Sequence, residues 1–152
     1  MKLQMILAAS LFATTMMTGA ALAEDHQVHM LTRGEDGQMM VFEPAYLEIA
    51  PGDTVTFLPT EPSHNAESIL TMLPEGAEPF KGRINQEITV TFDEEGVYGI
   101  KCLPHYGLGM VGLIKVGDGE APNLGEAAAV RHPGRANQRF HDLFELVEAG
   151  TE

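Results

Sequence analysis

The pattern of hydrophobic and polar positions changes twice along the chain and divides it into three parts. Residues 3–20 are almost entirely apolar or small. Between residues 27 and 116, short segments rich in β-branched and aromatic residues alternate with turns that contain Gly, Pro, Asn or Asp. Within 88–92, apolar residues alternate with threonine, which is the period of a half-buried strand. After Gly119 the composition changes to Ala, Glu, Leu, Arg and Gln, which favours helices.

The middle part predicts a small antiparallel β-sandwich, because its short strands and turns recur at the spacing typical of that architecture. Turn signals such as Pro51-Gly52-Asp53 separate the segments. The six predicted strands cover residues 27–31, 39–49, 54–59, 87–92, 97–102 and 110–116. The last part predicts two short helices, which begin near Pro122 and Pro133.

The second predicted helix carries one apolar stripe. Its apolar residues fall at offsets 0, 4, 7, 8 and 11, which places them on one face of a helix. They are Ala136, Phe140, Leu143, Phe144 and Val147. We expect this face to dock against the sandwich.

The apolar first part has the features of an export signal. Lys2 supplies a positive charge ahead of the apolar run, and Ala21-Leu22-Ala23 fits the A-x-A cleavage pattern. We therefore predict that a signal peptide of residues 1–23 is cleaved after Ala23 and that the protein is periplasmic. A permanent membrane anchor is the weaker interpretation, because the run contains several polar residues and no stop-transfer pattern follows it.

Cleavage would leave 24–152, which is 129 residues and suits one domain with its own core. We expect a sandwich over about 24–118 and a helical extension over about 120–150. The formal net charge is −13 for the whole chain and, because 1–23 carries one lysine and no acid, −14 after cleavage. This charge argues against nucleic acid as a partner. It agrees equally with the steering of a cationic partner and with a saline habitat.

The strongest chemical signal is the spacing Cys102-x2-His105-x4-Met110 on one short loop, with His64 upstream. Taken singly, Cys102 has the alternative of a buried small hydrophobe, and His105 that of a hydrogen-bonded loop residue. Together, one thiolate, two imidazoles and a thioether are the ligands of a blue-copper site. Structural zinc sites use four Cys or His ligands, so the thioether argues against zinc. We therefore predict one type 1 copper ion per chain, which transfers electrons without binding a substrate.

The cysteine count supports metal binding. A single cysteine excludes an internal disulfide, and a free thiol would be oxidised in an oxidising compartment. Ligation of a metal would protect it.

Several longer segments carry a family resemblance over nearly all of the chain after residue 23. They are Val28-His29-Met30-Leu31, Met40-Val41-Phe42-Glu43-Pro44-Ala45-Tyr46, Pro51-Gly52-Asp53-Thr54-Val55-Thr56-Phe57, His64-Asn65, Met72-Leu73-Pro74-Glu75-Gly76-Ala77-Glu78 and Lys101-Cys102-Leu103-Pro104-His105-Tyr106. With these segments the chain resembles the pseudoazurins, small blue-copper proteins of the cupredoxin family. The resemblance implies a mainly β fold, a cupredoxin-like Greek-key β-sandwich with two short C-terminal α-helices. It also implies the copper ligands His64, Cys102, His105 and Met110.

The resemblance further implies contacts around the copper ion. The backbone amide of Asn65 would donate toward the cysteine sulfur, and Met40 would pack against the His105 ring; such contacts tune a metal site. The sequence departs from the familiar pattern at Thr32, where asparagine is common, and at Leu103, where threonine is common. We expect both changes to remove hydrogen bonds near the site.

We expect His105 to lie near the surface, inside a small apolar patch on which a partner can dock. The patch would consist of Pro59, Pro104, Tyr106, Gly107, Leu108 and Gly109. In pseudoazurins, lysines surround this patch and meet acidic partners such as copper nitrite reductase. Here the corresponding cations would be Arg33, Lys81, Arg83 and Lys101. The resulting prediction is a monomeric electron carrier that docks transiently with redox proteins such as copper nitrite reductase and c-type cytochromes.

Two other functions are less favoured. A copper oxidase or nitrite reductase needs a further metal centre with several extra histidines, which the chain lacks, so we predict that it is not an enzyme. A periplasmic copper-storage or delivery protein is the alternative. Such proteins usually carry methionine-rich or histidine-rich tracts, whereas this chain has a single set of four ligands.

The remaining histidines have no predicted part in the copper site. His29, His132 and His141 have no cysteine or carboxylate at a metal-ligand spacing and are expected to be ordinary surface residues or residues with satisfied hydrogen bonds. Cleavage after Ala23 would make His26 the third residue of the chain, where an amine, two amides and an imidazole can surround Cu(II) or Ni(II). Whether this second site exists is open, as are the electron donor, the acceptor and the reduction potential.

Overall fold

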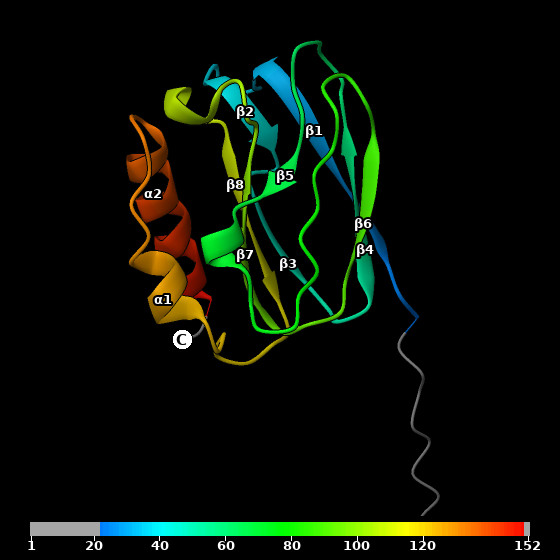
Figure 1. Cartoon of the computed structure of the whole chain (residues 1–152), viewed down its shortest axis with the longest axis vertical. Coiled ribbons are helices and arrows are strands. Elements are labelled where there is room, and N and C mark those ends of the chain that lie inside the picture. The colour runs from blue at the N-terminus through cyan, green and yellow to red at the C-terminus, as the bar shows by residue number, and fades with distance from the viewer. Residues whose placement is uncertain (1–21, 151–152) are drawn as a thin grey trace, which may run out of the picture.

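The computed structural model describes residues 22–150, in which two four-stranded sheets face each other and two helices cover the outer face of one of them (Figure 1). This arrangement confirms the predicted β-sandwich with two C-terminal helices. The predicted signal peptide, apart from Leu22 and Ala23, lies outside the described residues, so its cleavage stays a prediction.

The first sheet has the strand order β2-β1-β4-β6. Its strands are β1 (Asp25–Arg33), β2 (Met39–Glu43), β4 (Asp53–Leu58) and β6 (Ile88–Phe92). β1 is antiparallel to β2 but parallel to β4, with Val28 opposite Phe57. The predicted alternation of apolar residues and threonine appears in β4 and β6, where Thr56 and Thr89 face each other and share a hydrogen bond of 2.9 Å.

The second sheet has the order β3-β8-β7-β5. Its strands are β3 (Tyr46–Ile49), β5 (Glu67–Ser68), β7 (Gly96–Lys101) and β8 (Val111–Val116). β7 and β8 are antiparallel, whereas β3 and β8 are parallel. The expectation of a purely antiparallel sandwich is therefore wrong for two strand pairs. The chain crosses between the sheets before it returns beside an earlier strand, and a crossover of this kind produces a parallel pair.

The predicted single strand 39–49 is also wrong, because this segment forms two strands in different sheets. β2 pairs with β1, and β3 pairs with β8. Pro44 lies between them and has no N–H to continue a ladder of hydrogen bonds. The two-residue strand β5 was not predicted, since two residues carry no detectable period.

The core between the sheets is aromatic and extends to the end of the sandwich that carries the ligand loop. Phe42 and Phe57 meet edge to face at 6.1 Å, and Phe92 and Tyr98 at 4.9 Å. The same cluster of buried residues includes Cys102 and Met110. The sulfur-bearing residues of the motif are thus part of the hydrophobic core, which excludes water from them.

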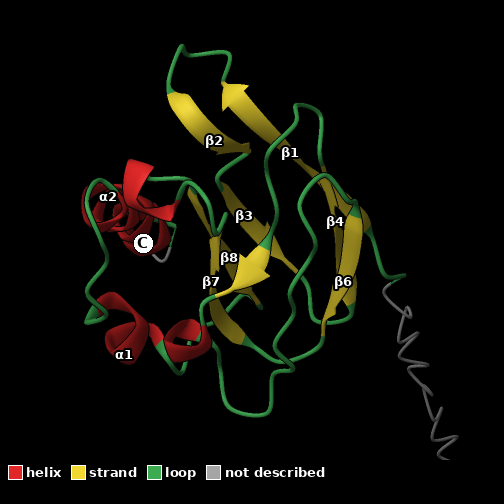
Figure 2. Cartoon of the chain, turned by 45° about the horizontal axis from the view of Figure 1, so that its top comes forward, coloured by secondary structure: helices red, strands yellow, loops and turns green. Residues whose placement is uncertain are grey.

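The helices α1 (Leu124–Ala128) and α2 (Ala136–Ala149) stack on the outer face of β7 and β8 (Figure 2). All five residues of the predicted stripe on α2 are buried and share a cluster with Val97, Val111 and Leu113. The docking prediction is confirmed. As a result β8 is covered on both faces, and all six of its residues are buried.

Candidate metal centre

The segment 102–110, which we call the ligand loop, connects β7 to β8 and is closed by hydrogen bonds between its own ends. The N–H of Cys102 donates to the carbonyl of Met110 at 3.0 Å, and the N–H of Met110 donates to the carbonyl of His105 at 3.1 Å. Gly109 has a φ of 94°, a left-handed conformation that favours glycine. These features bring Cys102, His105 and Met110 together.

His64 comes from a different loop, between β4 and β5, and is 1% exposed. Its carbonyl accepts a hydrogen bond from the N–H of Asn85 at 2.9 Å. Its ring atom Nε2 lies 3.1 Å from the hydroxyl of Thr32, which leaves Nδ1 facing the ligand loop. The ring is therefore oriented from behind, as is common for histidines that bind metals.

Three donor atoms face one another at one point. The Nδ1 atoms of His64 and His105 are 3.1 Å apart, and the Sγ atom of Cys102 lies 3.8 Å from the first and 3.6 Å from the second. A triangle with these sides has a centre about 2.0 Å from each corner, close to the bond lengths of about 2.0–2.3 Å that nitrogen and sulfur ligands make with a metal of this size. The three residues thus form a group able to hold a metal ion.

Met110 adds the fourth predicted donor. Its side chain is 0% exposed, and its backbone is hydrogen-bonded to both Cys102 and His105. A thioether beside one thiolate and two imidazoles fits copper and is foreign to the usual zinc sites. The donor set therefore fits a copper ion.

Without metal, the electrostatics of the site favour the neutral forms of Cys102 and His64. Burial raises the pKa of the Cys102 thiol, and hydrogen bonds from the backbone of Asn65 and His105 oppose this shift. Burial and the neighbouring His105 ring lower the pKa of His64. A metal ion that binds here must displace the thiol proton, but it finds the lone pair of His64 free.

Asn65 joins the two ligand-bearing segments. Its side-chain oxygen accepts a hydrogen bond from the N–H of Leu103 at 2.8 Å, and its side-chain nitrogen donates to Glu67 at 3.2 Å and to the carbonyl of Gly82 at 3.1 Å. The backbone hydrogen bond of Asn65 to the cysteine sulfur agrees with the predicted contact. The packing of Met40 against the His105 ring stays a prediction.

The expected loss of hydrogen bonds at Thr32 is wrong. The Thr32 hydroxyl bonds to His64, and the backbone N–H of Thr32 donates to Glu61. At Leu103 the side chain is 49% exposed and apolar, while the backbone N–H keeps its bond to Asn65. Threonine thus supports the His64 ring in this protein.

The surface around His105 is apolar. His105 is half-buried, whereas His64 is enclosed, so His105 is the histidine closer to solvent. Leu103 and Leu108 are each 49% exposed, and Pro104 and Gly107 are exposed beside them. The predicted position of His105 near the surface agrees with this exposure, whereas Gly109, one of the predicted patch residues, is buried.

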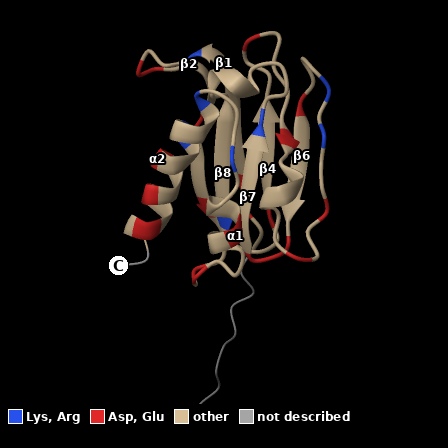
Figure 3. Cartoon of the chain, turned by 60° about the vertical axis from the view of Figure 1, so that its left-hand side comes forward, with Lys and Arg blue, Asp and Glu red and all other residues tan. Residues whose placement is uncertain are grey.

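Positive charges gather mainly in the half of the molecule that carries the ligand loop, whereas Asp and Glu lie on the loops at both ends (Figure 3). The Lys101 ammonium lies 5.2 Å over the Tyr106 ring and 3.3 Å from the buried carboxylate of Glu67, which Lys81 approaches to 3.6 Å. The expectation named four cations. It did not include Arg135, which precedes α2 and contacts the ligand loop through its backbone, or Arg139 of α2, which contacts it through its side chain.

The other histidines have varied contacts. His132 Nδ1 lies 2.6 Å from the hydroxyl of Tyr106, the neighbour of His105, which the sequence did not suggest. His141 does have carboxylates at a ligand spacing, Asp142 and Glu145, contrary to the prediction, although all three are exposed. His26 Nε2 bonds to Asp53 at 3.0 Å, and His26 belongs to the paired strand β1; the third-position metal site stays a prediction.

Comparisons with known proteins agree with this geometry. The model of the family of copper-binding proteins described as the plastocyanin/azurin family matches residues 28–117. A pseudoazurin from Paracoccus pantotrophus is 49% identical over 88% of this chain and 91% of its own. The chain belongs to the pseudoazurin family. Membership of a copper-binding family confirms the predicted cofactor, and the family's proteins are electron carriers, which agrees with the prediction that the chain is not an enzyme.

Solved pseudoazurin structures resemble this one over most of their length. One from Sinorhizobium has a TM-score of 0.80 at 43% identity and covers 84% of this chain and 98% of its own. Another, from Methylobacterium extorquens AM1, has a TM-score of 0.76 at 46% identity, with coverage of 81% and 98%. In residues 22–150 no helix is long and apolar enough to span a membrane.

Proposed function

We propose that this pseudoazurin is a periplasmic one-electron carrier whose single copper ion is held by His64, Cys102, His105 and Met110. The observation that carries the proposal is the triangle of two Nδ1 atoms and one Sγ atom, with sides of 3.1, 3.6 and 3.8 Å. The buried Met110 beside it supports a soft, copper-type site. The predicted signal peptide 1–23 supports export of a single domain over 24–152.

A bound copper ion supplies a reversible one-electron couple, and the chain's part is to hold the ligands still. Thr32 fixes the His64 ring, and Asn65 ties the ligand loop to the His64 segment. Backbone hydrogen bonds to the Cys102 sulfur favour its thiolate form. Because the three donor atoms already surround one point, we expect little rearrangement when an electron arrives or leaves.

The electron enters and leaves through His105. This residue connects the buried centre with the surface, and the exposed side chains of Leu103 and Leu108 lie on the same loop. An apolar contact surface can approach a partner without removing water from charged groups, which suits a short-lived complex. His64 is enclosed and offers no such route.

The partner that fits this face has an acidic rim, as copper nitrite reductase or a c-type cytochrome would need to have. Cations around an apolar patch raise the rate of encounter with such a partner, and salt screens this effect. We expect Arg33→Gln and Lys81→Gln to lower the second-order rate of electron transfer at low salt, with the difference disappearing at high salt. Equal rates at low salt would contradict this docking model.

Copper titration tests the proposed site. Metal-free protein should bind one equivalent of Cu(II) and develop the intense visible band of charge transfer from thiolate to Cu(II). One-electron reduction should remove the band, and reoxidation should restore it. Cys102→Ser, which keeps the shape of the site but removes the thiolate, should show no such band.

The same titration separates the carrier from the alternative, a copper-storage or delivery protein. The buried ligands favour slow exchange, because His64, Cys102 and Met110 are each at most 1% exposed. A carrier should retain copper in the presence of a moderate chelator through repeated redox cycles. Rapid loss of copper without reversible cycling would favour delivery instead.

A further inference from the structure

One side chain of the C-terminal helix is bonded to three backbone carbonyls at the copper end of the molecule. Arg139 of α2 donates from Nη1 to the carbonyls of Gly109 at 2.6 Å and Met40 at 2.7 Å, and from Nη2 to that of Met39 at 2.9 Å. Gly109 precedes the proposed ligand Met110, and Met39 and Met40 begin β2. A single guanidinium therefore connects α2, the ligand loop and the first sheet.

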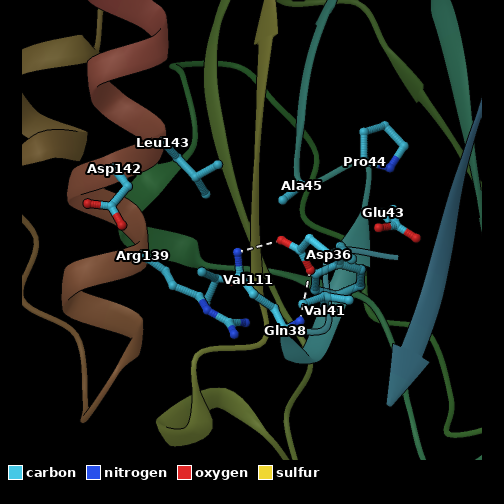
Figure 4. A pocket seen from close by; sticks show the side chains of 11 residues that line it. Asp36, Gln38, Val41, Glu43, Pro44, Ala45, Val111, Arg139, Asp142 and Leu143 are labelled. Carbon is cyan, nitrogen blue, oxygen red and sulfur yellow. Dashed lines mark hydrogen bonds between the residues drawn. The ribbon is translucent and has the colours of Figure 1, made fainter. Parts of the chain in front are cut away.

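Arg139 reaches these carbonyls along one side of a cavity of about 300 Å³ between α2 and β2 (Figure 4). Val111, Leu143, Asp36 and Asp142 are among the residues that line the cavity. Within residues 22–150 the guanidinium forms no salt bridge with either carboxylate, and its hydrogen bonds go to neutral carbonyls. The planar fork of an arginine can serve several acceptors at once, which the point charge of a lysine cannot do.

Two of the three carbonyls belong to residues with a left-handed backbone, and that of Gly109 also accepts a hydrogen bond from the N–H of Val111 at 3.0 Å. Met40 has a φ of 56°, which is uncommon for a residue with a side chain, and Gly109 has a φ of 94°. Fixing the Gly109 carbonyl also fixes the plane of the peptide bond that Gly109 shares with Met110. A contact from α2 thus helps to set the orientation of the residue that bears the thioether.

A second contact holds the same loop from the same side. The N–H of Arg135, the residue before α2, donates to the carbonyl of Gly107 at 3.0 Å. Gly134 is so close that a Cβ atom there would lie 2.3 Å from the Gly107 oxygen. The outer side of the ligand loop is therefore bound to α2 at Gly107 and again at Gly109.

We propose that Arg139 is a positioning residue for the copper centre, which acts through Gly109 on Met110 and through Met39 and Met40 on the start of β2. This inference deepens the proposed function and rests on it where copper is concerned. It assigns the C-terminal helix a part in the metal site in addition to its part in covering the second sheet.

Arg139→Met and Arg139→Gln test the proposal, and Arg135→Gln is the matched control. Arg135 lies one turn earlier, so its loss removes the same charge from the same region, while its exposed side chain makes no hydrogen bond in the described chain. Arg139→Lys keeps the charge but not the fork. Loss of the contacts, and not of the charge, is then what distinguishes the variants.

The first measurement uses metal-free protein. Exchange of the Met110 amide hydrogen should become about tenfold faster or more in Arg139→Met and Arg139→Gln, because charge-assisted hydrogen bonds that hold the loop are lost. Arg139→Lys should recover only part of this protection. Arg135→Gln should match the parent protein.

The second measurement uses copper-loaded protein, in which the visible spectrum and the reduction potential respond to the axial ligand. Both should change in Arg139→Met and Arg139→Gln by more than in Arg135→Gln, which reports the charge alone. A role limited to stability would leave them unchanged in the folded protein. If Arg139→Met unfolds, Arg139→Lys supplies the same comparison.

The proposal is overturned if the Arg139 variants match Arg135→Gln in amide exchange, spectrum and potential. Failure of the proposed function looks different. In that case the parent protein itself would show no thiolate charge-transfer band with copper, while the exchange data on metal-free protein would still decide whether Arg139 holds the ligand loop.

Discussion

The two ends of the sandwich differ in how their buried polar groups are paired. At the end opposite the ligand loop, the buried carboxylate of Asp53 accepts hydrogen bonds from the N–H of Glu24 at 2.8 Å, the N–H of Ala50 at 2.9 Å and the ring of His26 at 3.0 Å. The protein itself satisfies this group. At the copper end, the Nδ1 atoms of His64 and His105 face each other and the Cys102 thiol.

This difference separates a structural polar cluster from a functional one. Donors and acceptors around Asp53 complement one another, whereas the three atoms at the copper end are all of the kind that donates electron pairs to a metal. Burial alone does not distinguish them, since Asp53 and His64 are 4% and 1% exposed. The chemical kind of the atoms that face one another distinguishes the two clusters.

The largest expected effect comes from a substitution at the copper end. Cu(II) should stabilise the parent protein against unfolding, by about 2.7 kcal/mol when free copper is 100 times its dissociation constant. Cys102→Ser should lose most of this gain, because the thiolate is absent. Thermal unfolding with and without copper measures it. An equal gain in parent and variant would show that copper stabilises the fold elsewhere.

The next largest effect is expected from a substitution at the opposite end. Asp53→Asn should lower the free energy of unfolding by about 2 kcal/mol, because a charge-assisted acceptor of buried N–H groups is lost. Denaturant unfolding of the copper-free protein measures the change. The visible spectrum of the copper-loaded variant should equal that of the parent, and a changed spectrum would contradict the independence of the two ends.

The same carboxylate predicts a dependence on pH. Hydrogen bonds from the backbone of Glu24 and from the ring of His26 hold the pKa of Asp53 below its usual value. In acid the unfolded chain therefore binds the proton more readily, so this stabilisation is complete above about pH 4 and is lost as the pH falls through the folded value. Unfolding free energies at a series of acidic pH values should show a shallower decline in Asp53→Asn than in the parent.

The smallest expected effect concerns the support of His64. Thr32→Val removes the hydroxyl that bonds to Nε2 and should cost about 1 kcal/mol of stability while shifting the reduction potential. Thr32→Ser keeps a hydroxyl and should retain the parent potential. Voltammetry of both variants checks this, and identical potentials in Thr32→Val and the parent would remove Thr32 from the account of the site.

The sequence predicted those features that depend on local spacing. The loop motif placed Cys102, His105 and Met110 together, and an apolar stripe of period 3.6 located α2. The break at Pro44 was missed, because an alternating pattern does not state which sheet a strand joins. Neither does it state whether neighbouring strands run parallel.

The support of the site was harder to predict, because it uses contacts between distant segments. Arg139 bonds to carbonyls of residues 99 and 100 positions earlier. Every residue has a backbone carbonyl, so the sequence does not indicate which carbonyls accept such a bond. The hydrogen bonds of Thr32 to His64 and of His132 to Tyr106 likewise join residues far apart in the chain. Only the folded arrangement brings these partners together.

The close approach of Gly134 to Gly107 has a consequence for engineering. With no room for a side chain at position 134, the linker before α2 and the ligand loop have complementary shapes, and neither can be redesigned alone. A graft of residues 102–110 into another β-sandwich would transfer the ligands without the surface that shapes their loop. The transferable unit is the loop together with its helix.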